Sequence, residues 1–88
     1  MDRVAAIRER LGNALAPDSL AITDESHLHA GHPGAAGGGG HYAVAIVSAE
    51  FTGRSLLERH RLVYAALDDL MPAEIHALSI RASAPDEA

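Results

Sequence analysis

Residues 41–48 read HYAVAIVS, and the rest of the fold can be worked out from this stretch. Alternation of larger and smaller apolar side chains is typical of a β-strand with one face on a core. We assign the bulkier set, Tyr42, Val44 and Ile46, to the buried face. His41 and the smaller side chains then lie on the opposite face.

A helix is predicted to follow this strand after a turn at residues 50–53. Residues 55–58 read SLLE, a Ser-x-x-Glu capping box of the kind that begins helices, and Pro72 closes the helix. The predicted buried face carries Leu56, His60, Val63, Tyr64, Leu67 and Leu70, and the predicted solvent face carries Glu58, Arg59, Arg61, Asp68 and Asp69. A short helical turn at residues 73–75 and a third strand at residues 76–83 are expected next.

The first part of the chain is predicted to hold one helix and one strand. Residues 3–16 repeat apolar side chains at helical spacing, with Asp2 as the expected N-cap and Pro17 as the stop. Residues 19–24 alternate as a strand does. Residues 25–40 hold six of the eight glycines, and we expect a flexible loop there because glycine loses much backbone entropy on ordering.

The order of these elements predicts the architecture. It runs helix, strand, strand, helix, short helix, strand (α-β-β-α-α-β). An antiparallel strand pair followed by a helical crossover to a parallel strand gives a three-stranded mixed sheet. With the helices on one face, the fold is a two-layer α/β sandwich. The length of 88 residues indicates a single domain, residues 1–88, whose tail at residues 84–88 is expected to fray.

The composition narrows the functional classes. The chain has a net charge of −5, with seven arginines and no lysine, which disfavours general binding to phosphate backbones and favours a neutral or basic partner. No apolar run is long enough to span a bilayer, and the first residues lack a signal peptide. We therefore expect no membrane association and a cytoplasmic location.

Histidine and cysteine content together indicate a metal-related role. The chain has no cysteine, so it supplies no disulfide, thiolate nucleophile or thiolate ligand. It has six histidines, and His27, His29 and His32 fall within six positions. Neutral imidazole is a good ligand for iron, zinc and copper. No arrangement of nucleophile, base and orienting residue stands out, so we do not expect an enzyme.

Five short motifs, in order, resemble the BolA family over nearly the whole chain. They are Asp24-Glu25-Ser26-x-x-His29, Gly40-His41-Tyr42, Val47-Ser48-x-x-Phe51-x-Gly53, Arg59-His60-Arg61-x-x-Tyr64 and Ile75-His76-Ala77-Leu78. Each motif is weak alone, but their order and spacing together are specific. The family often has an acidic residue with Ser or Thr before the histidine of the second strand, where this chain has Gly39-Gly40.

The resemblance implies a class II KH-like fold, which agrees with the predicted element order. It also implies a complex with a monothiol glutaredoxin that shares a [2Fe–2S] cluster, for cluster assembly and trafficking or for iron regulation. The glutaredoxin would supply its active-site cysteine, glutathione a second thiolate, and this chain two imidazoles. By motif matching these are His76 and His29, with His32 and His27 as alternates for the second. No cofactor is expected in the isolated chain.

Two histidines outside this set have structural interpretations. His41 is expected to make a structural polar contact rather than to bind a metal. His60 is expected to pack and form hydrogen bonds within the second helix.

Two other functions stay open at this point. The first is DNA binding with regulation of transcription in stress response or morphology. Its candidate surface is Arg54, Arg59 and Arg61, which would serve a protein partner equally. The second is metal buffering by the three loop histidines without a partner. The sequence also leaves formation of a homodimer open.

Overall fold

The structure is a computed structural model that describes residues 2–26 and 40–88. Its elements follow in the order α1 (Arg3–Leu15), β1 (Ser19–Asp24), β2 (Gly40–Val47), η3 (Ala49–Phe51), α2 (Leu56–Ala66), η4 (Asp68–Leu70), β3 (Ile75–Ser83) and η5 (Pro85–Glu87), where η marks a 3-10 turn. The predicted order of helices and strands and the α/β class are confirmed.

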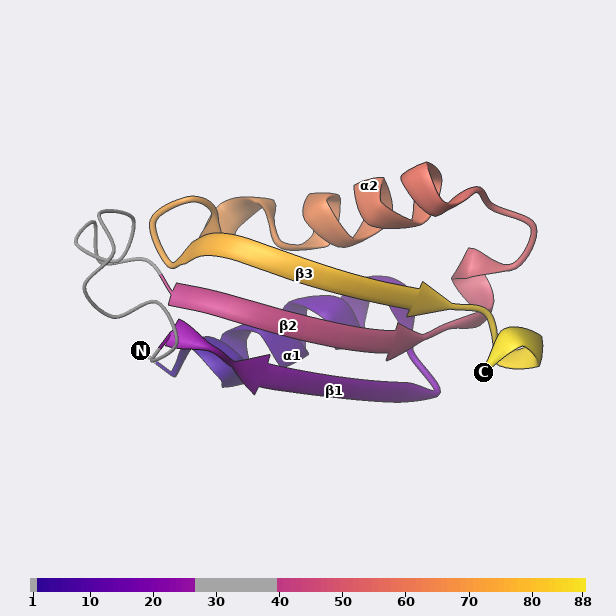
Figure 1. The fold of residues 1–88 in the computed structure, drawn as a ribbon, viewed down its shortest axis with the longest axis horizontal. Coiled ribbons are helices and arrows are strands. Elements are labelled where there is room, and N and C mark those ends of the chain that lie inside the picture. Colours follow the sequence, from indigo (N-terminus) through magenta and orange to yellow (C-terminus); the bar gives the residue numbers. More distant parts are fainter. Residues whose placement is uncertain (1, 27–39) are drawn as a thin grey trace.

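The three strands form one mixed sheet in the order β1-β2-β3 (Figure 1). β1 pairs antiparallel with β2, from Ser19 opposite Val47 to Asp24 opposite Tyr42. β2 pairs parallel with β3 through the crossover that contains α2. This is the strand arrangement that the sequence predicts.

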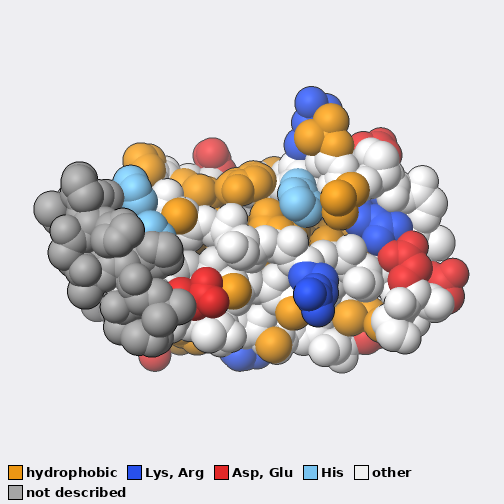
Figure 2. Space-filling view, viewed as in Figure 1, with side chains coloured by type: hydrophobic (Ala, Val, Ile, Leu, Met, Phe, Trp, Pro, Cys, Tyr) orange, Lys and Arg blue, Asp and Glu red, His pale blue; other side chains and the backbone are white. Residues whose placement is uncertain are grey.

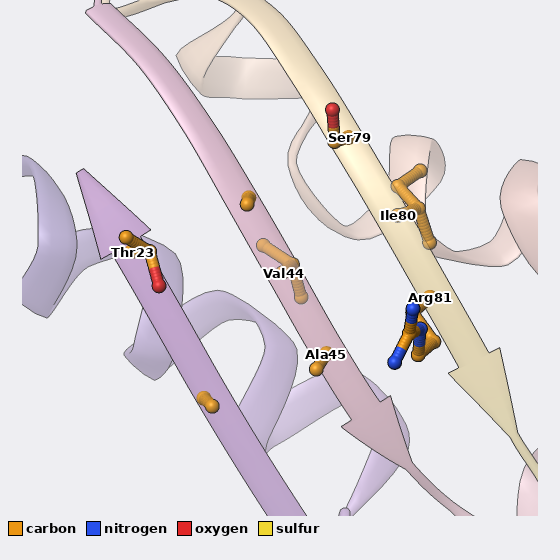
Figure 3. A pocket seen from close by; sticks show the side chains of 8 residues that line it. Thr23, Val44, Ala45, Ser79, Ile80 and Arg81 are labelled. Carbon is orange, nitrogen blue, oxygen red and sulfur yellow. The ribbon is translucent and has the colours of Figure 1, made fainter. Parts of the chain in front are cut away.

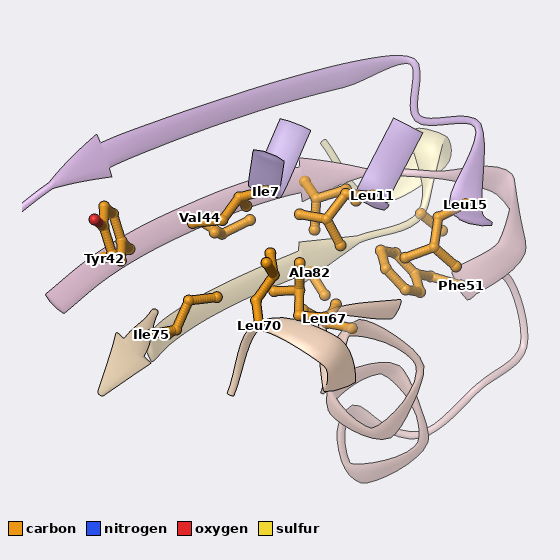
Figure 4. Packing of buried hydrophobic residues seen from close by; sticks show 13 residues of the cluster. Ile7, Leu11, Leu15, Tyr42, Val44, Phe51, Leu67, Leu70, Ile75 and Ala82 are labelled. Atoms are coloured by element: carbon orange, nitrogen blue, oxygen red, sulfur yellow. The ribbon is translucent and has the colours of Figure 1, made fainter. Parts of the chain in front are cut away.

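The core lies between the sheet and the two helices (Figure 4). Tyr42, Val44 and Ile46 point from β2 into it and are at most 3% exposed, so the predicted facing of this strand is confirmed. The other buried apolar side chains are Ile7, Leu11, Leu15, Phe51, Val63, Leu67, Leu70, Ile75, Ala82 and Ala84. Because α1 and α2 both contribute, both helices cover the same face of the sheet.

Side-chain caps fix where both helices begin. The Asp2 carboxylate accepts from the Ala5 N–H at the start of α1, and Ser55 and Glu58 form the reciprocal capping box of α2. Both caps agree with the sequence-based expectation. Within the described residues, no helix is both long and apolar enough to cross a membrane.

The end of α2 differs from the prediction. The helix stops at Ala66 rather than continuing to Pro72, and the short helical turn lies at Asp68–Leu70 rather than at residues 73–75. The Leu67 N–H is shared between the carbonyls of Val63 and Tyr64 at 3.2 Å each, and the Leu70 N–H bonds the Leu67 carbonyl at 2.9 Å. Bonds that reach three residues back instead of four tighten the backbone into a 3-10 turn. The α-helix therefore ends earlier than predicted.

The inward face of α2 also differs from the prediction. Arg59, expected to face water, is 9% exposed, whereas Leu56 and Tyr64, expected in the core, are 62% and 41% exposed. Arg59, Val63 and Leu67 follow one another at intervals of four, so they share one face of the helix. The arginine stem takes the place in the core that the hydrophobic pattern assigned to Leu56.

Burial of Arg59 is compensated by the C-terminal tail, which is ordered rather than frayed. Residues Pro85–Glu87 form the turn η5. The Arg59 guanidinium donates to both carboxylate oxygens of Glu87, at 2.5 and 2.8 Å, and to the carbonyls of Arg54 and Ala82. The Ala84 N–H donates to the same carboxylate. A paired, hydrogen-bonded charge can be buried, whereas an isolated one cannot.

The Arg59–Glu87 pair predicts a loss of stability in acid. The hydrogen bond from Arg59, followed by that from the Ala84 N–H, lowers the pKa of Glu87 from its ordinary 4.5 to about 2. A carboxylate with a depressed folded-state pKa stabilises the fold above its unfolded pKa and loses that contribution as the pH falls toward the folded value. We expect Glu87→Gln to lower the melting temperature by several degrees at pH 7. This difference in melting temperature from the parent chain should disappear as the pH falls from 4.5 to 2.

Thermal melts followed by circular dichroism across this pH range measure the effect. Glu50→Gln is the control, because Glu50 is exposed and its side chain forms no ion pair within the described part of the chain. If the melting temperatures of Glu87→Gln and the parent chain differ equally at pH 2 and pH 7, the charge of Glu87 does not contribute to stability.

Candidate metal-binding site

His76 lies at an irregularity in the sheet that turns it outward. Gly40 pairs with Ile75 and His41 with Ala77, so His76 is an extra residue in β3, as in a β-bulge. With strict alternation His76 would join Leu78, Ile80 and Ala82 on the helix-facing side of the strand. The extra residue instead places Ile75 in the core at 0% exposure and leaves His76 exposed. Bulges commonly aim a side chain at a functional site.

The ring of His41 lies beside the ring of His76. The ring centroids are 5.2 Å apart and the planes are inclined by 47°. His41 is half-buried and its Nε2 atom is shielded from solvent. With metal–nitrogen bonds of about 2.0–2.1 Å, two imidazoles at this separation can reach one ion. Figure 2 shows histidine side chains gathered at this end of the sheet.

Gly40 creates the space in which the neighbouring Tyr42 side chain packs. A Cβ atom at position 40 would lie 2.5 Å from the Tyr42 hydroxyl and 2.6 Å from its ring. Tyr42 is buried at 3% exposure, so its ring has little freedom to move away. This contact accounts for the glycine directly before His41.

A polar hollow of about 430 Å³ opens at the same end of the molecule, lined by Asp2, Arg3, Val4, Asp24, Tyr42 and Glu74. Arg3 donates to the Glu74 carboxylate at 2.8 Å and closes part of it. The hydrogen bond to Glu74, followed by one with Tyr42, raises the pKa of Arg3. Within the described residues, no three histidines, cysteines or carboxylates gather as a metal site. What the described residues bring together at this end of the sheet is the pair of imidazoles of His41 and His76.

The predicted site residues divide into two groups. His29, His32 and His27 lie outside the described residues, so their part in a site stays a prediction. His76 is exposed on a strand, as a ligand from a rigid element must be. His41, which the sequence suggested only as a structural residue, is brought next to it. The signal for this neighbour was available in the parallel pairing of the predicted strands 41–48 and 76–83, which both begin with histidine.

The arginine surface is smaller than predicted. Arg54 and Arg61 are exposed, but Arg59 is buried and bonded to Glu87. His60 is half-buried, and its Nε2 atom is buried without a hydrogen-bond partner within the described residues. The expected packing role of His60 agrees with this position, whereas the expected hydrogen bonding is not seen at Nε2.

The two-layer sandwich, with both helices on one face of a three-stranded mixed sheet, places this chain in a class of small α/β domains. Comparison with known families gives this class its name. The model of the BolA-like protein family matches residues 11–87. The chain belongs to the BolA-like protein family. BolA-like proteins are not known as an enzyme family.

Individual relatives agree with this assignment. BolA-like protein 1 of Homo sapiens is 47% identical over 81 residues, covering 92% of this chain and 57% of the relative. SufE-like protein 1, chloroplastic/mitochondrial, of Arabidopsis thaliana is 44% identical and covers 92% of this chain. The chain spans 23% of that protein's length and a little over half of BolA-like protein 1.

Solved structures show the same fold. The BolA domain of SufE1 from Arabidopsis thaliana superposes with a TM-score of 0.87 at 42% identity, covering 100% of this chain and 98% of that one. BolA1 from the same organism gives 0.84 at 39% identity, with the same two coverages.

Proposed function

We propose that this chain binds a monothiol glutaredoxin and contributes imidazole nitrogen to a [2Fe–2S] cluster that the two proteins share. The role is in cluster assembly, trafficking or iron regulation, and it requires no catalysis by this chain. The observation that carries the proposal is the exposed His76, held on a bulged strand beside His41.

The donor set supports a shared cluster rather than one held by this chain alone. The chain has no cysteine, and the described residues offer a pair of imidazoles without a third ligand. Iron in a [2Fe–2S] centre accepts two histidines on one iron when thiolates hold the other. The missing thiolates then come from the partner protein and glutathione.

We propose His76 as the anchoring ligand and one further histidine of this chain as the second ligand. His41 is the candidate supported by the 5.2 Å ring separation. His29, with His32 and His27 as alternates, is the candidate supported by the family motif. His41 would be in place before docking, because its ring already lies beside that of His76.

Anaerobic reconstitution tests the proposal. The chain, a monothiol glutaredoxin, glutathione, iron and sulfide are combined and separated by size exclusion. We expect a heterodimer that elutes with the visible absorption of a [2Fe–2S] cluster and differs in spectrum from the glutaredoxin alone. A colourless mixture with no heterodimer would overturn the proposal. Tight stoichiometric iron or zinc binding by this chain alone would favour metal buffering instead.

DNA binding is the weaker alternative. Of the three arginines first considered, only Arg54 and Arg61 are exposed, and the chain has a net charge of −5. Each phosphate contact adds to the affinity and to its salt dependence, so a surface with two exposed arginines supports only weak binding. Failure to shift promoter fragments even at low salt would remove this alternative.

A further inference from the structure

The face of the sheet that points away from the helices, called here the outer face, carries mostly small side chains. β2 turns every second side chain to the core, so its remaining ones point outward. Their directly paired neighbours in β1 and β3 lie on the same face, which gives the set Ala21, Thr23, His41, Ala43, Ala45, Ala77, Ser79 and Arg81. A sheet face in contact with water normally carries polar side chains. Alanine at half of these positions instead suits close packing against another layer.

A shallow groove of about 310 Å³ crosses the middle of the outer face (Figure 3). Arg81 is the one charged residue among those that line it, and none of the chain's twelve acidic residues does so. The Arg81 guanidinium forms no ion pair within the described part of the chain. The centres of protein interfaces are likewise poor in acidic residues and enriched in arginine. The groove therefore fits a partner that offers little charge except a carboxylate opposite Arg81.

The outer face continues into the histidine pair of the candidate metal-binding site. His41 belongs to this face, and the ring of His76 lies 5.2 Å from its ring. Ala45 lies four residues from His41 along β2, roughly 13 Å, and is paired with Arg81. A standard interface covers about 800 Å² on each protein, a patch with a radius of roughly 16 Å. An interface centred on the rings of the histidine pair therefore reaches Ala45 and Arg81.

The geometry points to the outer face as the surface on which the thiolate-bearing partner of the shared cluster docks, with a carboxylate of the partner bound to Arg81. This inference rests on the proposed function and adds the face from which the partner approaches. A protein whose thiolates hold iron at His41 and His76 must contact this chain around those rings. A second copy of this chain does not fit, because it has no cysteine and its own groove presents arginine rather than a carboxylate.

Two other surfaces fit this partner less well. The polar hollow at the histidine end lies on the helix side of the sheet, because the core residue Tyr42 and the start of α1 line it. The exposed Leu56 and Leu57 begin α2, at the end of the molecule away from the start of β3, where His76 lies (Figure 1). Of the three surfaces, the outer face is the one that carries His41 itself.

Two substitutions on the outer face test the docking surface, each with a matched control on α1, which packs on the opposite side of the sheet. Ala45→Trp fills the groove, and Ala14→Trp adds the same side chain to the helix layer. Arg81→Glu reverses the cation of the groove, and Arg8→Glu makes the same change of charge on α1. All four parent residues are exposed, so these variants leave the core intact.

The test is anaerobic sedimentation velocity of each variant with glutathione, iron, sulfide and graded concentrations of a monothiol glutaredoxin, followed through the cluster absorption. We expect Ala45→Trp to weaken the heterodimer about tenfold or more, because a tightly packed interface does not accommodate the added ring. Arg81→Glu should weaken it about fivefold or more through repulsion of the partner's carboxylate. Both α1 controls should bind as the parent chain does. At saturating glutaredoxin, the outer-face variants should give the parent cluster spectrum, because the histidines are unchanged.

Four results would overturn the docking surface. Equal affinities of the outer-face variants and their α1 controls would do so while leaving the shared cluster in place. Weakening by Arg61→Glu instead of Arg81→Glu would move the partner to α2. Self-association of the parent chain alone that Ala45→Trp abolishes would assign the face to a second copy. A parent chain that forms no heterodimer would overturn the proposed function and, with it, this inference.

Discussion

His76→Ala is expected to lose at least about tenfold in retention of the shared cluster while keeping its fold, because changing even the outer-shell partners of a metal commonly costs 10–100-fold in affinity. His76 is exposed at the start of β3, so its removal leaves no cavity in the core. The measurement is the visible absorption of the reconstituted heterodimer per glutaredoxin, followed during a challenge with a chelator.

Replacement by another ligand separates a metal-binding role from a structural one. His76→Cys should retain a cluster with an altered spectrum and a lower reduction potential, because imidazole raises the potential relative to thiolate. His60→Ala is the control histidine, since it lies on α2 and not in the His41–His76 pair. An unchanged cluster in His76→Ala would refute the assignment. The larger loss among His41→Ala and His29→Ala identifies the second ligand.

Phe51→Ala is expected to lower the free energy of unfolding by about 3–5 kcal/mol, the usual cost of emptying the space of a buried phenylalanine. Phe51 is 0% exposed and packs beside Leu15 (Figure 4). Domains of this length are stable by only about 4–13 kcal/mol in total, so the variant should be close to unfolding at physiological temperature.

Urea denaturation of the isolated chain measures this loss. Leu57→Ala is the matched control: it also removes a large apolar side chain, but one that is 60% exposed, and it should change stability by no more than about 0.5 kcal/mol. Equal losses in the two variants would show that Phe51 does not anchor the core.

Local sequence signals were sufficient for the architecture. The alternation in β2 and the capping box at Ser55 each depend on neighbouring residues only, and both are observed. The inward face of α2 was predicted wrongly because its composition suggested that charge faces water. The carboxylate of Glu87, 28 residues away, makes burial of Arg59 favourable, and nothing in the local pattern shows such a distant pair.

The site was predictable only in part for a related reason. The family motif singled out His76, but its outward direction depends on one extra residue in β3. Pairing register is a property of two strands together, and neither strand alone reveals it. The nearness of His41 follows from that register. The partner, the cluster and the loop ligands stay predictions.

The ion pair between Arg59 and Glu87 also determines where a reporter group can be attached to the chain. It holds the last turn of the described chain beside the final residues of β3, whereas His76 stands at the start of the same strand (Figure 1). Eight residue steps along a strand span roughly 26 Å. A dye or surface tether joined after Ala88 therefore leaves the histidine end unobstructed, and its distance to a labelled glutaredoxin would report how the two proteins meet.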